Sequence, residues 1–165
     1  MSDFHKFYDS EEKREVLSVI VVNKDSVLSR IVDLFSARGY NIDSLTVAPV
    51  PNTEYSRITI ITIGRARVID QIVKQLNKLI PVLKVIEHKN VIEKDTVPIK
   101  IPLDQSLSDV DVLARAYNGA IQNVTEDAIV ISATDEPKRI ANLIKVIEKY
   151  NPIEIVRSGV VAMER

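Results

Sequence analysis

Residues 16–28 decide the fold, and they read Val16-Leu17-Ser18-Val19-Ile20-Val21-Val22-Asn23-Lys24-Asp25-Ser26-Val27-Leu28. The first seven residues are largely β-branched and apolar on both faces, which predicts a buried strand. The next four form a turn that ends in residues suited to cap a helix. Apolar residues then recur at helical spacing as far as Phe35, and Gly39 predicts the helix stop. The stretch therefore predicts a strand, a short loop and a helix.

The residues that follow this stretch, as far as residue 88, complete one structural unit. Residues 45–48 and 57–63 predict two further strands, because they are short and apolar, and the second is rich in Ile and Thr. An amphipathic stripe from Val68 to Leu79 predicts a second helix that ends before Pro81. Residues 82–88 then supply a fourth strand. The order βαββαβ is that of a ferredoxin-like domain, in which both helices cover one face of four antiparallel strands.

The same order repeats in the second half. Strands are predicted at residues 97–103, 120–124, 128–133 and 153–156, with one helix at 107–117 and another after the capping residue Asp135. Pro98 and Pro102 place the first of these strands at a sheet edge. We therefore predict an α+β fold of two tandem ferredoxin-like domains.

The domain boundaries follow from polar segments. Asn90 to Thr96 is polar and charged and predicts a linker, which divides the chain into domains of residues 16–90 and 97–165. Residues 1–15 are polar and mixed in charge, and we expect a flexible N-terminal tail there.

Composition excludes several function classes. The 165 residues carry 22 Lys plus Arg against 23 Asp plus Glu, so no excess of positive charge favours nucleic acid. The absence of cysteine, with only His5 and His88 as histidines, predicts no metal site. No apolar run approaches the ~20 residues of a membrane-spanning helix, and residues 1–15 lack the apolar core of a signal peptide. We expect a cytoplasmic protein with neither a nucleic-acid nor a membrane partner.

The chain carries no recognisable catalytic motif. With 4 glycines it has no phosphate-binding loop. We expect its serines to cap helices or lie on solvated faces, and His88 to lie at the surface. An enzyme of the acylphosphatase kind would need an arginine positioned beside Asn23, and none is evident. The serines without a histidine at a spacing typical of a relay are Ser18, Ser29, Ser36 and Ser44.

Two features predict partners. The strands at 16–22 and 57–63 are apolar on both faces, so one sheet face would remain exposed, and we expect a homodimer or higher oligomer. The helix that begins after Ser26 offers free backbone amides to an anionic group such as a carboxylate. Simple N-capping by that serine is the alternative for this loop.

One block of sequence resembles a known family. Arg38-Gly39-Tyr40-Asn41-Ile42, followed by Ser44-Leu45-Thr46-Val47, closely resembles the small regulatory subunits of acetolactate synthase. The resemblance extends from Val16 to the C-terminus, and it includes the block Arg157-Ser158-Gly159-Val160-Val161-Ala162-Met163.

The resemblance implies both a fold and a function. Residues 16–90 would form an ACT domain, a ferredoxin-like module that pairs side by side and binds amino acids at the pair interface. The protein would have no catalysis of its own. It would bind and activate the large catalytic subunit in valine, leucine and isoleucine biosynthesis and confer feedback inhibition by valine. The chain would hold no cofactor, with thiamine diphosphate, Mg and FAD expected in the large subunit.

The resemblance also implies which residues hold the effector. The family usually has glycine where this chain has Ser26, so we expect that hydroxymethyl group to crowd the ligand and its oxygen to cap the helix amides. A stand-alone amino-acid-binding ACT sensor is the alternative function, although it gives no role to residues 157–163. The implied effector residues are Asn23, Ser26, Val27 and Leu28 of one subunit, and Asn41 and Ile42 of the other.

Overall fold

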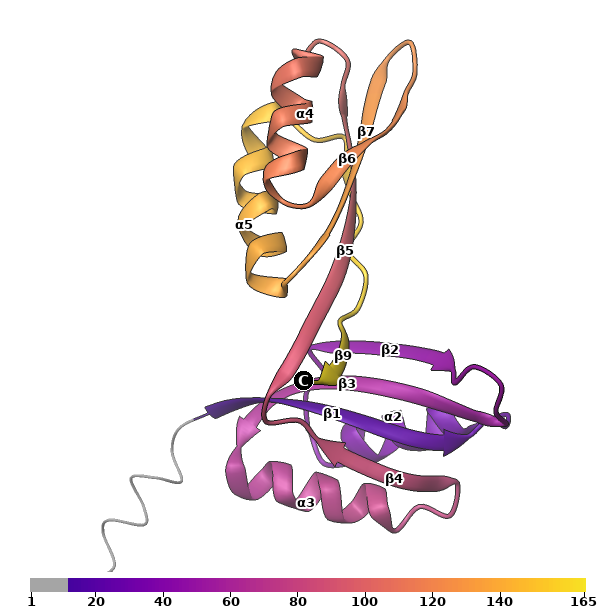
Figure 1. Ribbon diagram of the computed structural model, residues 1–165. Helices are drawn as coiled ribbons and strands as arrows, with labels where there is room; N and C mark the ends of the chain where they lie inside the picture. The colour runs from indigo at the N-terminus through magenta and orange to yellow at the C-terminus, as the bar shows by residue number, and fades with distance from the viewer. Residues whose placement is uncertain (1–11) are drawn as a thin grey trace, which may run out of the picture. The chain divides into compact units, whose positions relative to one another are not determined.

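Two sheets, each with two helices on one face, make up the computed structural model, which describes residues 12–165 (Figure 1). The chain forms two units: the residues up to Val91 together with Ala162–Arg165, and Ile92–Val161. Residues 1–11 of the expected tail lie outside the described part. Residues 12–15 belong to the first strand, so the prediction of a tail as far as residue 15 was wrong at its end.

The first unit has the predicted βαββαβ order. Its antiparallel sheet has the strand order β2-β3-β1-β4, which is the ferredoxin-like arrangement. Gly39 takes φ +67 just after the first helix, a conformation that glycine adopts without strain. The elements are β1 (Glu12–Val22), α2 (Val27–Ser36), β2 (Ser44–Pro49), β3 (Tyr55–Arg65), α3 (Ala66–Asn77) and β4 (Val82–Glu87).

Alternation along the central strands builds the core of this unit. Leu17, Val19 and Val21 point toward the helices and are buried with Ile58 and Ile60 of the neighbouring strand. The helices contribute the large side chains that meet them. These are Ile31, Phe35, Ile72 and Leu76.

The opposite face of this sheet is less exposed than the sequence predicts. Val16, Ser18, Thr59 and Ile61 lie on the face away from the helices, yet each is buried within the single chain. Ala162, from the C-terminal end of the same unit, is also buried. The expectation of a wholly open apolar face was therefore wrong, because the first unit includes the end of the chain.

The second unit repeats the topology. Its sheet has the order β6-β7-β5-β8, and β9 pairs with β5 outside that path. This order confirms the second ferredoxin-like copy. The elements are β5 (Val91–Pro102), α4 (Leu107–Ala116), β6 (Gly119–Val124), β7 (Ala128–Asp135), α5 (Pro137–Ile147), a 3-10 turn η1 (Glu148–Tyr150) and β8 (Glu154–Ile155). The last strand, β9 (Val161–Glu164), belongs to the first unit from Ala162 onward.

Strand β5 corrects two predictions. It begins at Val91, so the expected linker of residues 90–96 is mostly strand. It also lies between β7 and β8 and not at a sheet edge. The carbonyls of Pro98 and Lys100 accept hydrogen bonds from the segment around β8. Because the N–H and C=O of a strand residue point to the same side, the N–H that Pro98 lacks would face this two-residue strand. The pairing of β5 with β7 is therefore intact.

Charged residues of the expected linker are paired inside the second unit. Nζ of Lys94 lies 3.1 Å from Oδ1 of Asp135, and Nε of Arg157 lies 2.6 Å from Oδ2 of Asp95. Asp135 also accepts hydrogen bonds from the amide of Glu136, which holds the N-cap position of α5, and from Arg139. Burial opposes ionisation of Asp135, but the bonds from Arg139, that amide and Lys94 outweigh it and lower the pKa to about 2.

Candidate functional site

The loop between β1 and α2 is held by backbone hydrogen bonds. The N–H of Asn23 donates to the carbonyl of Glu54 over 2.9 Å, and the N–H of Lys24 donates to that of Val22 over 2.9 Å. The first bond ties the loop to the start of β3. The loop therefore has a defined path where it enters the helix.

Ser26 holds the N-cap position of α2 in a left-handed conformation, with φ +66. Its carbonyl accepts bonds from the N–H of Arg30 (3.1 Å) and the hydroxyl of Ser29 (2.8 Å). N-cap serines usually have extended backbone, which brings the hydroxyl over the first turn. Here the hydroxyl makes no cap hydrogen bond to any described residue. The prediction that its oxygen competes for the helix amides was therefore wrong.

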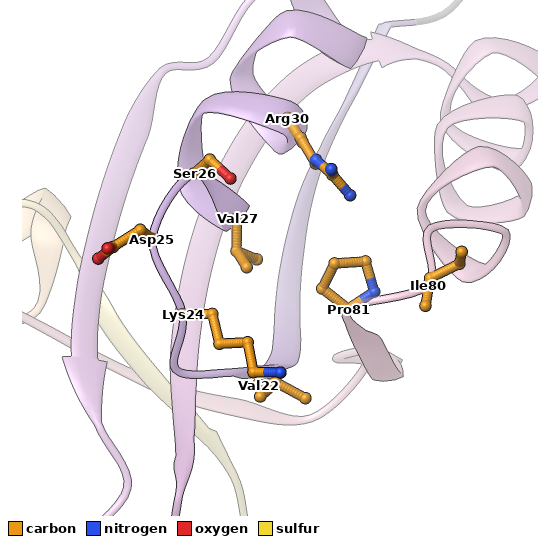
Figure 2. A pocket seen from close by; sticks show the side chains of 8 residues that line it. All are labelled: Val22, Lys24, Asp25, Ser26, Val27, Arg30, Ile80 and Pro81. Atoms are coloured by element: carbon orange, nitrogen blue, oxygen red, sulfur yellow. The ribbon is translucent and has the colours of Figure 1, made fainter.

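A cavity of about 240 Å³ opens beside this loop (Figure 2). The apolar side chains come from the end of β1, the first turn of α2 and the loop before β4. Arg30 extends toward Pro81, Lys24 extends toward Val22, and Asp25 points away from both. The lining residues are Val22, Lys24, Asp25, Ser26, Val27, Arg30, Ile80 and Pro81.

This arrangement suits a small molecule with a carboxylate and an apolar side chain. Lys24 and Arg30 bring positive charge to a cavity with an apolar wall of Val22, Val27 and Pro81. Guanidinium and ammonium groups form charge-assisted hydrogen bonds with carboxylates. The positive end of the α2 dipole favours the same group.

The structure brings together only part of the predicted effector set. Ser26 and Val27 line the cavity, whereas Asn23 and Leu28 are exposed beside it. Asn41 lines a separate cavity of about 440 Å³, and Ile42 packs against the core of the first unit. The expected contribution of Asn41 and Ile42 from a second subunit stays a prediction.

Six residues that line the cavity were not among the predicted effector residues: Val22, Lys24, Asp25, Arg30, Ile80 and Pro81. Lys24 is in the loop that the sequence singled out, but its charge was not weighed. Arg30 follows Ser26 by four residues, a spacing that places both on one side of a helix and could have identified it. Ile80 and Pro81 are far away in sequence and reach the cavity because β4 pairs with β1.

A second group of polar side chains also contradicts the sequence analysis. Ser18 Oγ lies 2.8 Å from Nε2 of His88, and Nδ1 of His88 lies 2.8 Å from Oε2 of Glu164. His88 is buried, not at the surface, and Ser18 does have a histidine partner. Hydrogen bonds from His88 and from the amide of Asn90 lower the pKa of Glu164. The set resembles a catalytic triad in its connections only, because Ser18 is 0% exposed and no substrate can reach it.

Within residues 12–165, no three His, Asp or Glu side chains gather in a way that could hold a metal ion. In the same part of the chain, no helix is both long and apolar enough to cross a membrane.

In comparisons with known proteins, both halves of the chain match families of acetolactate synthase small subunits. Residues 17–84 match the family described as the AHAS small subunit-like ACT domain, and residues 94–165 match the small subunit of acetolactate synthase. The chain is 38% identical over 156 residues to the acetolactate synthase small subunit of Buchnera aphidicola subsp. Schizaphis graminum, which covers 92% of this chain and 99% of that protein.

Two further relatives are similar over nearly their whole length. The isozyme 3 small subunit of Escherichia coli K12 is 38% identical, covering 92% of this chain and 96% of that protein. The crystal structure of the Thermotoga maritima small subunit superposes with a TM-score of 0.86 at 30% identity, covering 93% of this chain and 98% of that one.

Proposed function

Because the chain belongs to the family of acetolactate synthase small subunits, we propose that it is a non-catalytic regulatory subunit of that enzyme. It binds the large catalytic subunit, raises the rate of acetolactate formation, and makes that rate sensitive to a branched-chain amino acid. The large subunit holds thiamine diphosphate, Mg and FAD. The holoenzyme thereby regulates valine, leucine and isoleucine biosynthesis in the cytoplasm.

The observation that carries this proposal is the cavity at the start of α2 in the ACT unit. Arg30 and Lys24 bind the effector carboxylate, with the first-turn amides of α2 beside them. Val22, Val27 and Pro81 contact the effector side chain. The cavity therefore offers contacts to the carboxylate and to the apolar side chain of a branched-chain amino acid.

Size favours a small effector. Pockets for drug-sized ligands commonly occupy about 300–1,000 Å³. The cavity here is about 240 Å³, and the hydroxymethyl group of Ser26 forms part of its wall. Valine, with a short branched side chain, is the effector we propose.

A homodimer completes the proposed site. Strand β2 lies at the edge of the first sheet, and Asn41 and Ile42 lie in the short segment before it, separated from it by Asp43. Pairing of two β2 edges would bring those residues to the effector loop of the neighbouring subunit. The amide of Asn41 then contributes a polar contact to the bound amino acid, as the family resemblance implies.

Reconstitution with the large subunit separates this function from that of a stand-alone sensor. A regulatory subunit co-elutes with the large subunit in gel filtration and raises its rate of acetolactate formation from pyruvate. A stand-alone sensor binds the amino acid but neither co-elutes nor changes the rate. Separate elution together with an unchanged rate would contradict the proposed function.

A further inference from the structure

Three side chains from distant parts of the chain form a continuous hydrogen-bonded series in the first unit. Ser18 comes from the middle of β1, His88 follows β4, and Glu164 is in β9. Ser18 and His88 are separated by 70 residues, and His88 and Glu164 by 76. The series is not part of the cavity beside α2.

The chemistry of the three groups sets the direction of each bond. An ionised carboxylate only accepts hydrogen bonds, so Nδ1 of His88 donates to Glu164. In the neutral imidazole Nε2 then accepts from the hydroxyl of Ser18. Burial of an imidazole without partners would be costly, and here both ring nitrogens are satisfied.

Backbone groups hold the same carboxylate from the other side. The N–H of Asn90 donates to Oε1 of Glu164 over 3.1 Å, and the N–H of Arg165 donates to the carbonyl of Asn90 over 2.9 Å. Both carboxylate oxygens of Glu164 are therefore bound, to residues on either side of Lys89. The hydrogen bonds from His88 and Asn90 lower the pKa of Glu164, which keeps it ionised.

The chain passes between the two units twice, and these bonds lie close to both crossings. The chain leaves the first unit between Val91 and Ile92, and it returns between Val161 and Ala162. All of the second unit lies between these two crossings. Within the returning segment Ala162–Arg165, Glu164 contacts the first unit through Nδ1 of His88 and the backbone N–H of Asn90.

We propose that Ser18, His88 and Glu164 form a latch that fastens the returning end of the chain to the first unit. With the latch closed, both crossings between the units are held. With it open, the returning end loses its side-chain contacts and is held by backbone hydrogen bonds alone. One consequence rests on the proposed function: the closed latch is needed for an effector bound to the first unit to influence the second.

Amide hydrogen exchange on the full chain tests the latch without any partner. Glu164→Gln removes the charge, and the half-exposed side chain makes this variant well tolerated. We expect the amides of Asn90 and Arg165 to exchange about tenfold faster, the change expected when local opening becomes easier by about 1.4 kcal/mol. The amide of Ile31 in α2 should be unchanged. Glu87→Gln, an exposed glutamate beside His88, is the matched control and should leave all three amides unchanged.

Ser18→Ala provides a second test from the buried end of the series. It should accelerate exchange at the same two amides by a smaller factor, because the His88–Glu164 bond remains. Histidine ¹⁵N shifts should show the proton of neutral His88 on Nδ1. Wild-type protection of Asn90 and Arg165 in Glu164→Gln, or a proton on Nε2 with none on Nδ1 in the wild type, would overturn the latch.

The consequence for regulation has its own readout. In the reconstituted holoenzyme, Glu164→Gln should raise the valine concentration for half-inhibition several-fold without changing the rate in the absence of valine. Faster exchange with an unchanged valine response would overturn the coupling role. A wild-type holoenzyme that does not respond to valine would overturn the proposed function, while the exchange data would still decide the latch.

Discussion

The backbone N–H of Val22 donates a 3.0 Å hydrogen bond to the carbonyl of Pro81. Val22 ends β1 and Pro81 immediately precedes β4, so the bond joins two walls of the cavity beside α2. Backbone pairing thus fixes the distance between the apolar walls. The adjustable parts of the site are the long side chains of Lys24 and Arg30.

Ser26→Gly should both stabilise the protein and strengthen the site. A non-glycine residue in the left-handed region costs about 1–2 kcal/mol, from which the greater freedom of glycine in the unfolded chain subtracts about 0.4–1 kcal/mol. We expect a gain of up to about 1.6 kcal/mol in the free energy of unfolding. Removal of the hydroxymethyl group from the cavity wall should lower the valine concentration for half-inhibition several-fold. Urea unfolding and inhibition assays measure the two effects.

Ser26→Ala is the control, because alanine keeps the backbone strain and a side-chain carbon but lacks the hydroxyl. It should resemble the wild type in both assays. If alanine and glycine strengthened inhibition equally, the hydroxyl would be the obstacle, and backbone conformation would have no part in it.

Arg30→Met should weaken effector binding while leaving the fold intact. Methionine retains the apolar length of the side chain and removes the charge that we assign to the effector carboxylate. Charge-assisted hydrogen bonds contribute about 1.5–3 kcal/mol, so the valine concentration for half-inhibition should rise by at least about tenfold. Lys74→Met, an exposed lysine in α3, is the matched control and should leave inhibition unchanged. Equal curves for the two variants would remove Arg30 from the site.

The stability of the second unit should fall in acid because of Asp135. The pKa of this buried carboxyl is lowered to about 2 in the folded chain, below its ordinary value. A group with a depressed folded pKa stabilises the protein fully above its unfolded pKa, and this contribution is lost as pH falls toward the folded pKa. Stability should therefore decrease from about pH 4 to pH 2.

Asp135→Asn should remove most of that pH dependence and lower stability at pH 7. The loss should be about 1–3 kcal/mol, since Arg139 and Lys94 lose a charged acceptor but remain partly solvated. Urea unfolding across this pH range measures it, with exposed Asp70→Asn as the control. A variant with the wild-type pH profile would show that Asp135 is not the responsible carboxyl.

Patterns within single elements predict most of the fold, and contacts between distant elements account for the failures. Alternation and helical spacing locate both βαββαβ copies because each element follows from its own residues. The run Glu93-Lys94-Asp95 looked like a linker, since nothing local shows that Lys94 pairs with Asp135 and Asp95 with Arg157. These pairings make a charged segment part of a strand.

The sequence likewise predicted the local features of the candidate site and not its contacts between distant residues. Ser26 and Val27 follow from the loop and the start of the helix, which are local. The left-handed backbone of Ser26 was not foreseen, because serine fits an ordinary N-cap equally well. The bond between His88 and Glu164 joins residues 76 apart, and a single sequence carries no signal for it.

The protein should be a dimer that pairs through β2. This strand has a neighbour on one side only in the described sheet, and Val47 in it is 45% exposed. Val47→Glu should place like charges near each other across such a pair and weaken it. Sedimentation equilibrium should show a wild-type dimer at micromolar concentration and a larger monomer fraction for this variant. Val112→Glu, at an exposed valine of α4, is the control, and a wild-type monomer would contradict the dimer.

We propose that this chain makes acetolactate synthase sensitive to valine through the cavity beside α2. The most direct measurement is acetolactate formation by the large subunit, with and without this protein, across a valine titration. We expect a higher rate when the protein is present, inhibition by valine only in its presence, and inhibition shifted to higher valine concentration by Arg30→Met. A valine response that is the same without this protein, or the same with Arg30→Met, would contradict it.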